Sequence, residues 1–276
     1  MLELPEAAVI AEQVNERVVG KTIAAVEAGH SPHKWAWYYG DPADYEPRLK
    51  DRRIEGATFW GGLIEIATED AQLYLGDGVN LRYLEAEAPR PKKHQLLIDF
   101  EDGSSLLGSV SMYGGLWVCP AGELPNKYLA IAMEKPSPYD ERFTTGYFAS
   151  LFENASEALS AKAFLATEQR IPGLGNGVLQ DILYNAGIHP KRKIASLDAD
   201  VRMSLYDAVR TTLAAMREAG GRDTERLLFG EPGGYRTLLS RNTVGTPCTR
   251  CGAVIEKAAY LGGSVYFCPG CQVEAA

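Results

Sequence analysis

Hydrophobic and polar residues alternate through much of the first half of the chain. Between residues 21 and 118 the alternation recurs between turn signals, as in residues 63–66 and 95–100. A period of two sends successive side chains to opposite faces of a strand, so these segments predict strands with one buried face. Several such strands in series predict an N-terminal β-sandwich.

A period near 3.6 marks helices at the start of the chain and in its second half. Residues 7–19 show an amphipathic pattern that Gly20 ends, which predicts a helix leading into the sandwich. Residues 198–219 carry five apolar positions on one face before Gly220 and Gly221, which predicts one long helix. The five are Val201, Leu205, Val209, Leu213 and Met216.

Residues 161–190 predict two helices joined by a tight glycine turn. Pro172 and Gly173 break the first helix, and Gly175 and Asn176 open the second. Backbone N–H groups at a helix N-terminus can bind an anion, and the helix dipole favours a phosphate there. The alternative interpretation is a plain helical hairpin with a glycine corner.

Four of the five cysteines form two Cys-x-x-Cys pairs with sixteen residues between them: Cys248, Cys251, Cys268 and Cys271. Four thiolates at this spacing suit one tetrahedral zinc ion in a hairpin ribbon and leave no open position for catalysis. We therefore predict a structural zinc site. Cys119 is left as an isolated thiol that we expect to be buried.

Charge is distributed unevenly along the chain. The formal net charge is −8, yet residues 1–150 hold 14 Lys and Arg against 23 Asp and Glu, and residues 151–276 hold 14 against 13. Any phosphate-binding surface must therefore be local and lie in the second half. No apolar run reaches membrane length, and Glu3 and Glu6 stand where a secretory signal needs basic residues, so we expect a cytoplasmic protein without a membrane partner.

These patterns predict an α+β chain of two domains and a ribbon. Residues 1–125 form the N-terminal β-sandwich with its leading helix, residues 139–240 the helical domain, and residues 241–276 the zinc ribbon. The Pro-rich residues 134–138 are the predicted linker. We expect a monomer.

A glycine turn of this kind followed by a four-cysteine ribbon resembles the formamidopyrimidine-DNA glycosylase and endonuclease VIII family, with its helix–two-turns–helix motif and zinc finger. The resemblance implies that the chain binds damaged or abasic DNA. Lys162, Gly173, Gly175 and Asn176 match the positions that hold the DNA backbone. His94 follows Lys93 as in the family's Lys-His-Asp-His strand, and is a further candidate for nucleic-acid contact.

The first six residues are similar to the family's start, in which a proline after the initiator methionine precedes Glu-Leu-Pro-Glu. That proline supplies the amine that attacks the sugar, and Leu2 replaces it here. The resemblance implies that Glu3 is the acid/base group, that Glu6 is a second carboxylate, and that the α-amino group of Met1 lies one residue out of position. The alternative is that Glu3 and Glu6 only cap the first helix.

Three further positions depart from the family. Asp77 stands where a methionine enters the duplex, residues 111–114 lack the arginines of the matching segment, and Gly263 replaces an arginine of the ribbon. The leading hypothesis is a DNA N-glycosylase with weak or absent AP lyase activity. The alternative is a non-catalytic, zinc-dependent nucleic-acid-binding module.

A weaker third hypothesis keeps the enzyme class with RNA or single-stranded DNA as substrate. It rests on residues 33–39 and Tyr45, which are rich in aromatic side chains that could stack on unpaired bases or form a small hydrophobic cluster.

Overall fold

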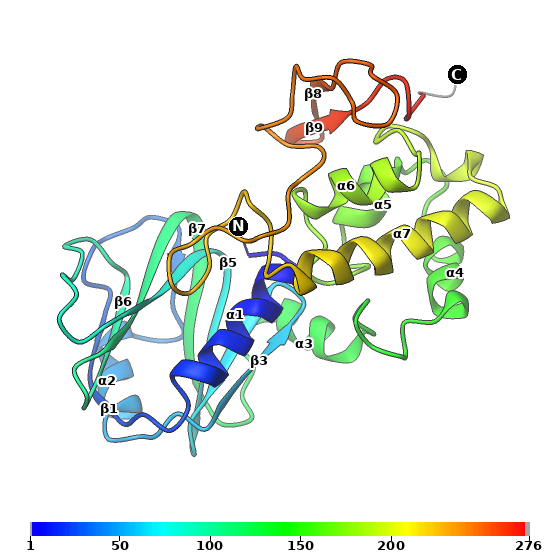
Figure 1. The fold of residues 1–276 in the computed structure, drawn as a ribbon. Coiled ribbons are helices and arrows are strands. Elements are labelled where there is room, and N and C mark those ends of the chain that lie inside the picture. Colours follow the sequence, from blue (N-terminus) through cyan, green and yellow to red (C-terminus); the bar gives the residue numbers. More distant parts are fainter. Residues whose placement is uncertain (1, 274–276) are drawn as a thin grey trace.

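The structure, a computed structural model, describes residues 2–273 and places a sheet domain beside a helical domain, with a small ribbon above the latter (Figure 1). No helix in this described range is long and apolar enough to cross a membrane. The helices are α1 Leu4–Arg17, α2 Tyr45–Leu49, α3 Lys127–Glu134, α4 Thr145–Glu153, α5 Ala161–Ala166, α6 Val178–Asn185 and α7 Ala199–Glu218, with 3-10 turns at Pro42–Asp44 and Ile194–Ser196. The strands are β1 Ile23–Ala28, β2 Ala36–Trp37, β3 Gly56–Trp60, β4 Leu63–Ala67, β5 Ala71–Leu84, β6 Leu96–Phe100, β7 Ser105–Pro120, β8 Glu256–Tyr260 and β9 Gly263–Phe267.

The first seven strands form one sheet in the order β1-β6-β7-β5-β4-β3, with β2 pairing β7 in parallel. The long strands β5 and β7 pair along most of their length, and the ladder shifts register between Asp77 and Val79. Strands from both ends of this order, such as β1 and β4, supply residues to one hydrophobic core. The sheet therefore encloses a common core, which confirms the predicted sandwich, and Tyr74 and Trp117 belong to a second, smaller cluster.

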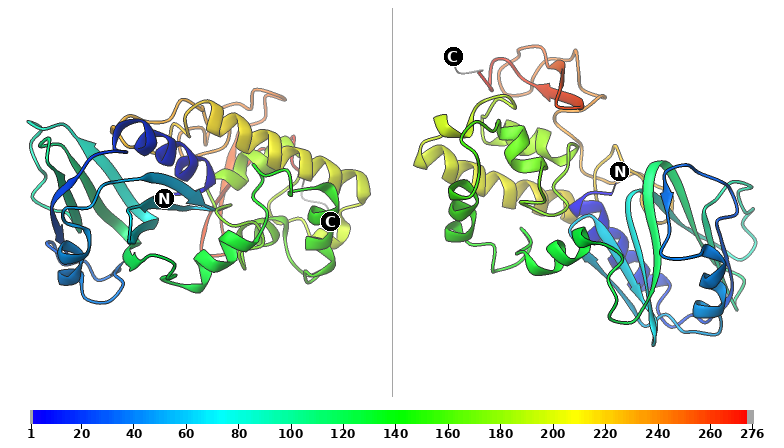
Figure 2. Two further views of the ribbon diagram at one scale, coloured as in Figure 1. Left: turned by 90° about the horizontal axis from the view of Figure 1, so that it is seen from below. Right: turned by 180° about the vertical axis from the view of Figure 1, so that it is seen from behind.

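Helix α1 lies between the two domains, in contact with β3 and β4 on one side and α7 on the other (Figure 2). Ala7, Ile10 and Val14 enter the sheet core, whereas Leu4 belongs to the core of the helical domain. The start of the chain is thereby held at the junction.

The long helix α7 is the main structural element of the helical domain. Asp198 caps it by accepting a hydrogen bond from Val201 N at 2.9 Å. The apolar face predicted from the sequence packs against α6 and α4: Leu205, Val209, Leu213 and Met216 are buried there.

The segment after α7 returns to the sheet domain. Leu227 and Leu228 join the sheet core, and Leu228 O accepts a hydrogen bond from Tyr83 N at 2.8 Å. Residues 222–233 therefore cross the junction between the domains a second time. Their sequence of glycine and charged residues does not predict this crossing.

Candidate functional site

The N-terminal segment connects the sheet to the glycine turn. Leu2 N donates to Asp77 O at 2.7 Å, and Leu4 N donates to Gly173 O at 2.8 Å. The Leu2 nitrogen is thus a backbone donor already in use. Met1, whose amine was the candidate nucleophile, lies outside the described residues.

Glu3 is only 5% exposed and lies at the N-terminus of α6. Its carboxylate accepts hydrogen bonds from Gly177 N at 2.8 Å and Val178 N at 2.7 Å. The anion that the glycine turn holds in this structure is therefore the Glu3 carboxylate, which satisfies amides that have no partner within the helix. Burial raises the pKa of Glu3, although Arg222 and the two amides act in the opposite direction.

Glu3 and Glu6 share one buried cation, Arg222, which our sequence analysis missed. The Arg222 guanidinium donates to Glu6 Oε1 at 2.9 Å and to Oε2 at 2.7 Å, and its Nη1 lies 3.5 Å from Glu3 Oε2. Arg222 N adds a hydrogen bond to Glu6 Oε1 at 3.2 Å. Glu3 thus caps α6 and Glu6 holds Arg222, so both carboxylates fasten α1 to the helical domain. Neither side chain caps α1, so the alternative prediction that they only cap the first helix is wrong.

The glycines of the turn permit this close packing. A Cβ atom on Gly177 would lie 1.8 Å from Arg222 Nη1, and one on Gly175 would lie 2.7 Å from the Glu3 carboxyl carbon. Gly173 has φ of 79°, a conformation that costs glycine little, and it packs against the backbone of Gly61. The turn therefore needs glycine in order to enclose the buried charges.

Asp77 lies at the bend of β5, where its φ of 58° is in the left-handed region that aspartate tolerates better than most residues. Burial raises the pKa of Asp77. Burial, Asp77 and Glu3 together raise the pKa of Tyr113, on the neighbouring strand β7. The surroundings of the chain start are consequently acidic and contain a phenol.

Lys162 and Asn176 meet at the turn between β8 and β9. Lys162 Nζ donates to Tyr260 O at 2.6 Å, and Asn176 Nδ2 donates to Ser264 O at 3.0 Å. Burial lowers the pKa of the Lys162 ammonium. A Cβ atom on Gly263 would lie 3.4 Å from Lys162 Nζ and 3.6 Å from Asn176, so these three residues, distant in sequence, share one spot.

His94 lies apart from them, in the sheet domain. It is 4% exposed, its Nδ1 lies 3.1 Å from Pro91 O, and its Nε2 lies 3.0 Å from Glu27 Oε2. Glu27, His30 and His94 are close enough to be considered as metal ligands. However, the two imidazole rings stack at 4.4 Å with 6° between their planes, so their in-plane lone pairs cannot converge on one ion.

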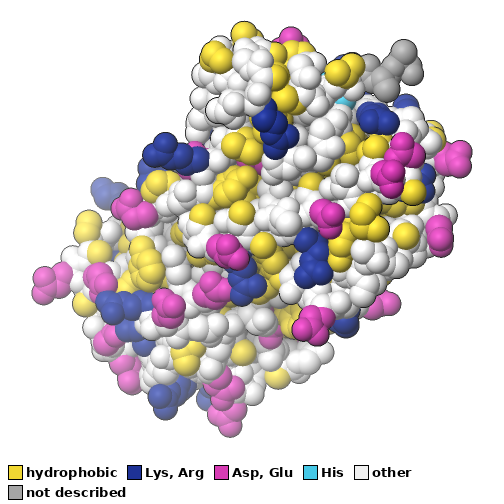
Figure 3. Space-filling model, turned by 45° about the vertical axis from the view of Figure 1, so that its right-hand side comes forward, with side chains coloured by type: hydrophobic (Ala, Val, Ile, Leu, Met, Phe, Trp, Pro, Cys, Tyr) yellow, Lys and Arg dark blue, Asp and Glu magenta, His cyan; other side chains and the backbone are white. Residues whose placement is uncertain are grey.

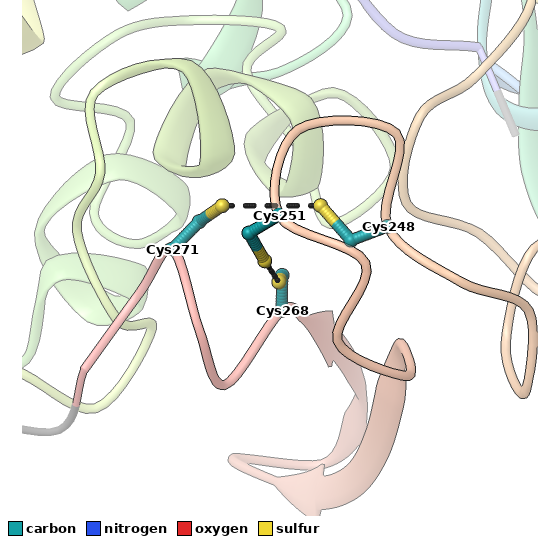
Figure 4. Close-up of side chains that lie close together, drawn as sticks. All are labelled: Cys248, Cys251, Cys268 and Cys271. Atoms are coloured by element: carbon teal, nitrogen blue, oxygen red, sulfur yellow. Dashed lines mark hydrogen bonds between the residues drawn. The ribbon is translucent and has the colours of Figure 1, made fainter.

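The four ribbon cysteines are the better metal centre (Figure 4). Their sulfur atoms all lie within 4.8 Å of one another, with Cys248 and Cys271 at 3.8 Å and Cys251 and Cys268 at 3.4 Å. A tetrahedron with zinc–sulfur distances of about 2.3 Å has edges of about 3.8 Å, so the arrangement is compatible with zinc. Tyr184 OH, 3.1 Å from Cys248 Sγ, ties the cluster to α6.

Basic side chains do not dominate the face shown in Figure 3, where Lys and Arg are interspersed with Asp and Glu. This agrees with the net charge of −8. Binding of an anionic polymer would therefore depend on a few local contacts rather than on a broad basic surface.

Comparison with known proteins agrees with this geometry. A model of the formamidopyrimidine-DNA glycosylase N-terminal domain matches residues 1–144. Relatives named formamidopyrimidine-DNA glycosylase include one from Cytobacillus firmus, 29% identical over 99% of this chain and 100% of its own length. Another, from Mycolicibacterium paratuberculosis, is 27% identical over 99% of this chain and 98% of its own length.

Among solved structures, the crystal structure of a complex between Lactococcus lactis Fpg and DNA containing an abasic site matches with a TM-score of 0.82. The identity is 24%, over 98% of this chain and 99% of that one, which establishes the shared fold. The chain belongs to the formamidopyrimidine-DNA glycosylase family. Within this family it is of the DNA repair glycosylase type. Its sequence begins Met-Leu-Glu-Leu-Pro-Glu.

Proposed function

We propose that this protein is a cytoplasmic DNA N-glycosylase that binds damaged or abasic DNA and excises a base with Glu3 as its acid/base group. The observation that carries the proposal is the placement of Glu3, buried beside the start of the chain and held by Gly177 N and Val178 N. Burial raises the pKa of the Glu3 carboxyl above its ordinary value, and general acid–base catalysis uses carboxyl groups shifted in that direction. Glu6, paired with Arg222 through both carboxylate oxygens, positions the segment.

The lyase step is expected to be weak or absent. An α-amino group, with a reference pKa of about 7.7–8.0, is the natural amine nucleophile near pH 7. The α-amino group of Met1 is displaced by one residue, or about 3.8 Å of chain, from the family's proline nitrogen. Misplacement of a reacting atom by about 1 Å can cost a hundredfold in rate. The nitrogen at the proline's position, Leu2 N, is an amide that donates to Asp77 O.

We place the DNA backbone along Lys162, Gly173, Gly175 and Asn176. His94, the further contact predicted from the sequence, is buried with both ring nitrogens engaged, so the proposal leaves it out. Lys162 has three donors, and the bond to Tyr260 O uses one of them. Asn176 is exposed at the same spot. In this proposal Cys248, Cys251, Cys268 and Cys271 hold a structural Zn²⁺ that keeps the β8–β9 turn beside these residues.

The chemistry is tested by incision assays on duplexes that carry 8-oxoguanine or an oxidised pyrimidine. We expect weak base release by the wild type, a fall of about a hundredfold or more in Glu3→Gln, and little borohydride trapping. Leu2→Pro should increase trapping, whereas the control Leu2→Ala, which provides no secondary amine, should increase it less. Strong incision that survives Glu3→Gln would show that Glu3 is not the acid/base group. Strong trapping by the wild type would show that another amine is the nucleophile.

A non-catalytic nucleic-acid-binding module is the second candidate. One observation favours it: the Glu3 carboxylate already caps α6, a structural task that needs no substrate. Binding of abasic duplex without base release from any lesion duplex would support the module and contradict the enzyme.

A further inference from the structure

Residues 35–38 separate into an inward and an outward pair. Ala36 and Tyr38 pack against the sheet core, whereas Trp35 is 51% and Trp37 is 41% exposed. The stretch is therefore more than a small hydrophobic cluster, because its two largest side chains face solvent. Two tryptophans that are about half exposed, one in β2 and one in the turn before it, present aromatic surface to solvent.

Strand β7 extends this surface. β2 runs parallel to it, with Trp37 opposite Gly115, and the Trp37 ring lies 5.9 Å from the Tyr113 ring. We call Trp35, Trp37 and Tyr113 the tryptophan patch.

The tryptophan patch adjoins the proposed active site. Gly114, the residue after Tyr113, pairs with Asp77, and Asp77 O holds Leu2 N at 2.7 Å. Gly114 N also donates to Trp35 O at 2.9 Å, so one residue connects the patch to the bend that holds the chain start. A DNA strand reaching Glu3 would pass beside the patch.

We propose that the tryptophan patch is a stacking site for unpaired nucleobases of the DNA strand that enters the active site. The proposal rests on the proposed function and names a substrate class within it, DNA with unpaired bases next to the reacting nucleotide. Indole and phenol rings offer the flat faces on which any base can stack, and only unpaired bases can turn theirs toward a protein surface. Lys34 Nζ, 4.8 Å from the Trp35 ring centroid, lies over one face of that ring and adds a cation to the edge of the patch, which favours an anionic strand.

The experiment compares a single-stranded deoxyoligonucleotide, a duplex with a short unpaired gap, and a fully paired duplex of the same sequence, with binding followed by fluorescence anisotropy. Trp37→Ala and Trp35→Ala should each lose about five- to a hundredfold in affinity for the first two ligands, with no change for the paired duplex. Tyr128→Ala is the matched control, because Tyr128 is 52% exposed with Lys127 Nζ 5.4 Å from its ring, yet lies on α3 outside the patch.

Equal affinity of wild type and both tryptophan variants for gapped DNA would overturn the patch as a base-binding site. The same conclusion would follow if the variants lost as much affinity for the paired duplex as for the other two ligands. It would also follow if the only effect of the substitutions were to dissociate a dimer in analytical ultracentrifugation. Base release from a lesion duplex that depends on Glu3, with duplex binding that depends on Lys162, would show in those cases that the proposed function stands. A wild-type protein that binds none of the three ligands would overturn both proposals.

Discussion

At the scale of single residues, the group that decides the site is the buried cluster of Glu3, Glu6 and Arg222. Carboxylates at positions 3 and 6 could be predicted as functional from the sequence, but Arg222 could not, because it lies 216 residues from Glu6 and follows an unremarkable pair of glycines. Only the packing of α1 against α7 brings them together. Lys162 shows the same limit, since its bond to Tyr260 O depends on how the ribbon approaches α5.

Removing the charge of Arg222 should destabilise the protein strongly. Arg222→Met leaves two buried carboxylates without their cation, and breaking a buried pair in this way costs about 3–5 kcal/mol. Arg52→Met is the control, because its pair with Asp70 is solvent-exposed and such pairs contribute no more than about 1 kcal/mol. Urea unfolding of both variants measures the difference, and an equal effect would mean that the buried cluster is no stronger than a surface pair.

At the scale of elements, helix existence could be predicted well and helix ends less well. α1 begins at Leu4 rather than at residue 7 because Pro5 suits the first turn, where its missing N–H costs nothing. α5 ends at Ala166, before Pro172 and Gly173, which were predicted to break it, because Glu168 and Gln169 adopt φ of 58° and 49°. The spacing of hydrophobic residues in a sequence does not show which residues other than glycine adopt a left-handed backbone conformation.

The ribbon is the element whose chemistry followed most directly from spacing. We expect one zinc per chain by metal analysis, and no reactive thiol in the native protein. Chelation should expose four thiols to a thiol reagent, whereas Cys119 should react only after denaturation, because it is fully buried and burial raises its pKa to about 11. Cys268→Ala should abolish zinc binding. Four reactive thiols in native protein purified without chelator would contradict the metal site.

At the scale of the whole molecule, the two-domain α+β class could be predicted because the change of hydrophobic period coincides with the change of domain. The coupling between the domains could not, because Leu2, Leu4, Leu227 and Leu228 are ordinary apolar residues whose partners are set by tertiary packing. The proposed limits at residues 125, 139 and 240 stay predictions. These limits divide the chain by sequence order, whereas α1 and residues 222–233 both lie at the junction between the two domains.

The last prediction concerns the charge of the molecule and its affinity for DNA. With a net charge of −8, the protein has few cations with which to displace counterions, so its binding should be weak and its salt dependence shallow. Lys162→Ala should weaken binding to all DNA sequences alike and reduce the slope of log K against log salt by about one.

Gly263→Arg should have the opposite effect. The new side chain would start 3.4 Å from Lys162 Nζ and 3.6 Å from Asn176, at van der Waals distances that require no rearrangement, and would add a cation to the proposed phosphate site. We expect tighter binding of paired duplex and a slope steeper by about one, whereas Gly263→Gln, of similar length but neutral, should change neither. Affinity measured across a series of salt concentrations tests this directly. If Gly263→Arg binds no better than Gly263→Gln, the phosphate does not lie at Lys162 and Asn176, and the DNA path proposed here is misplaced.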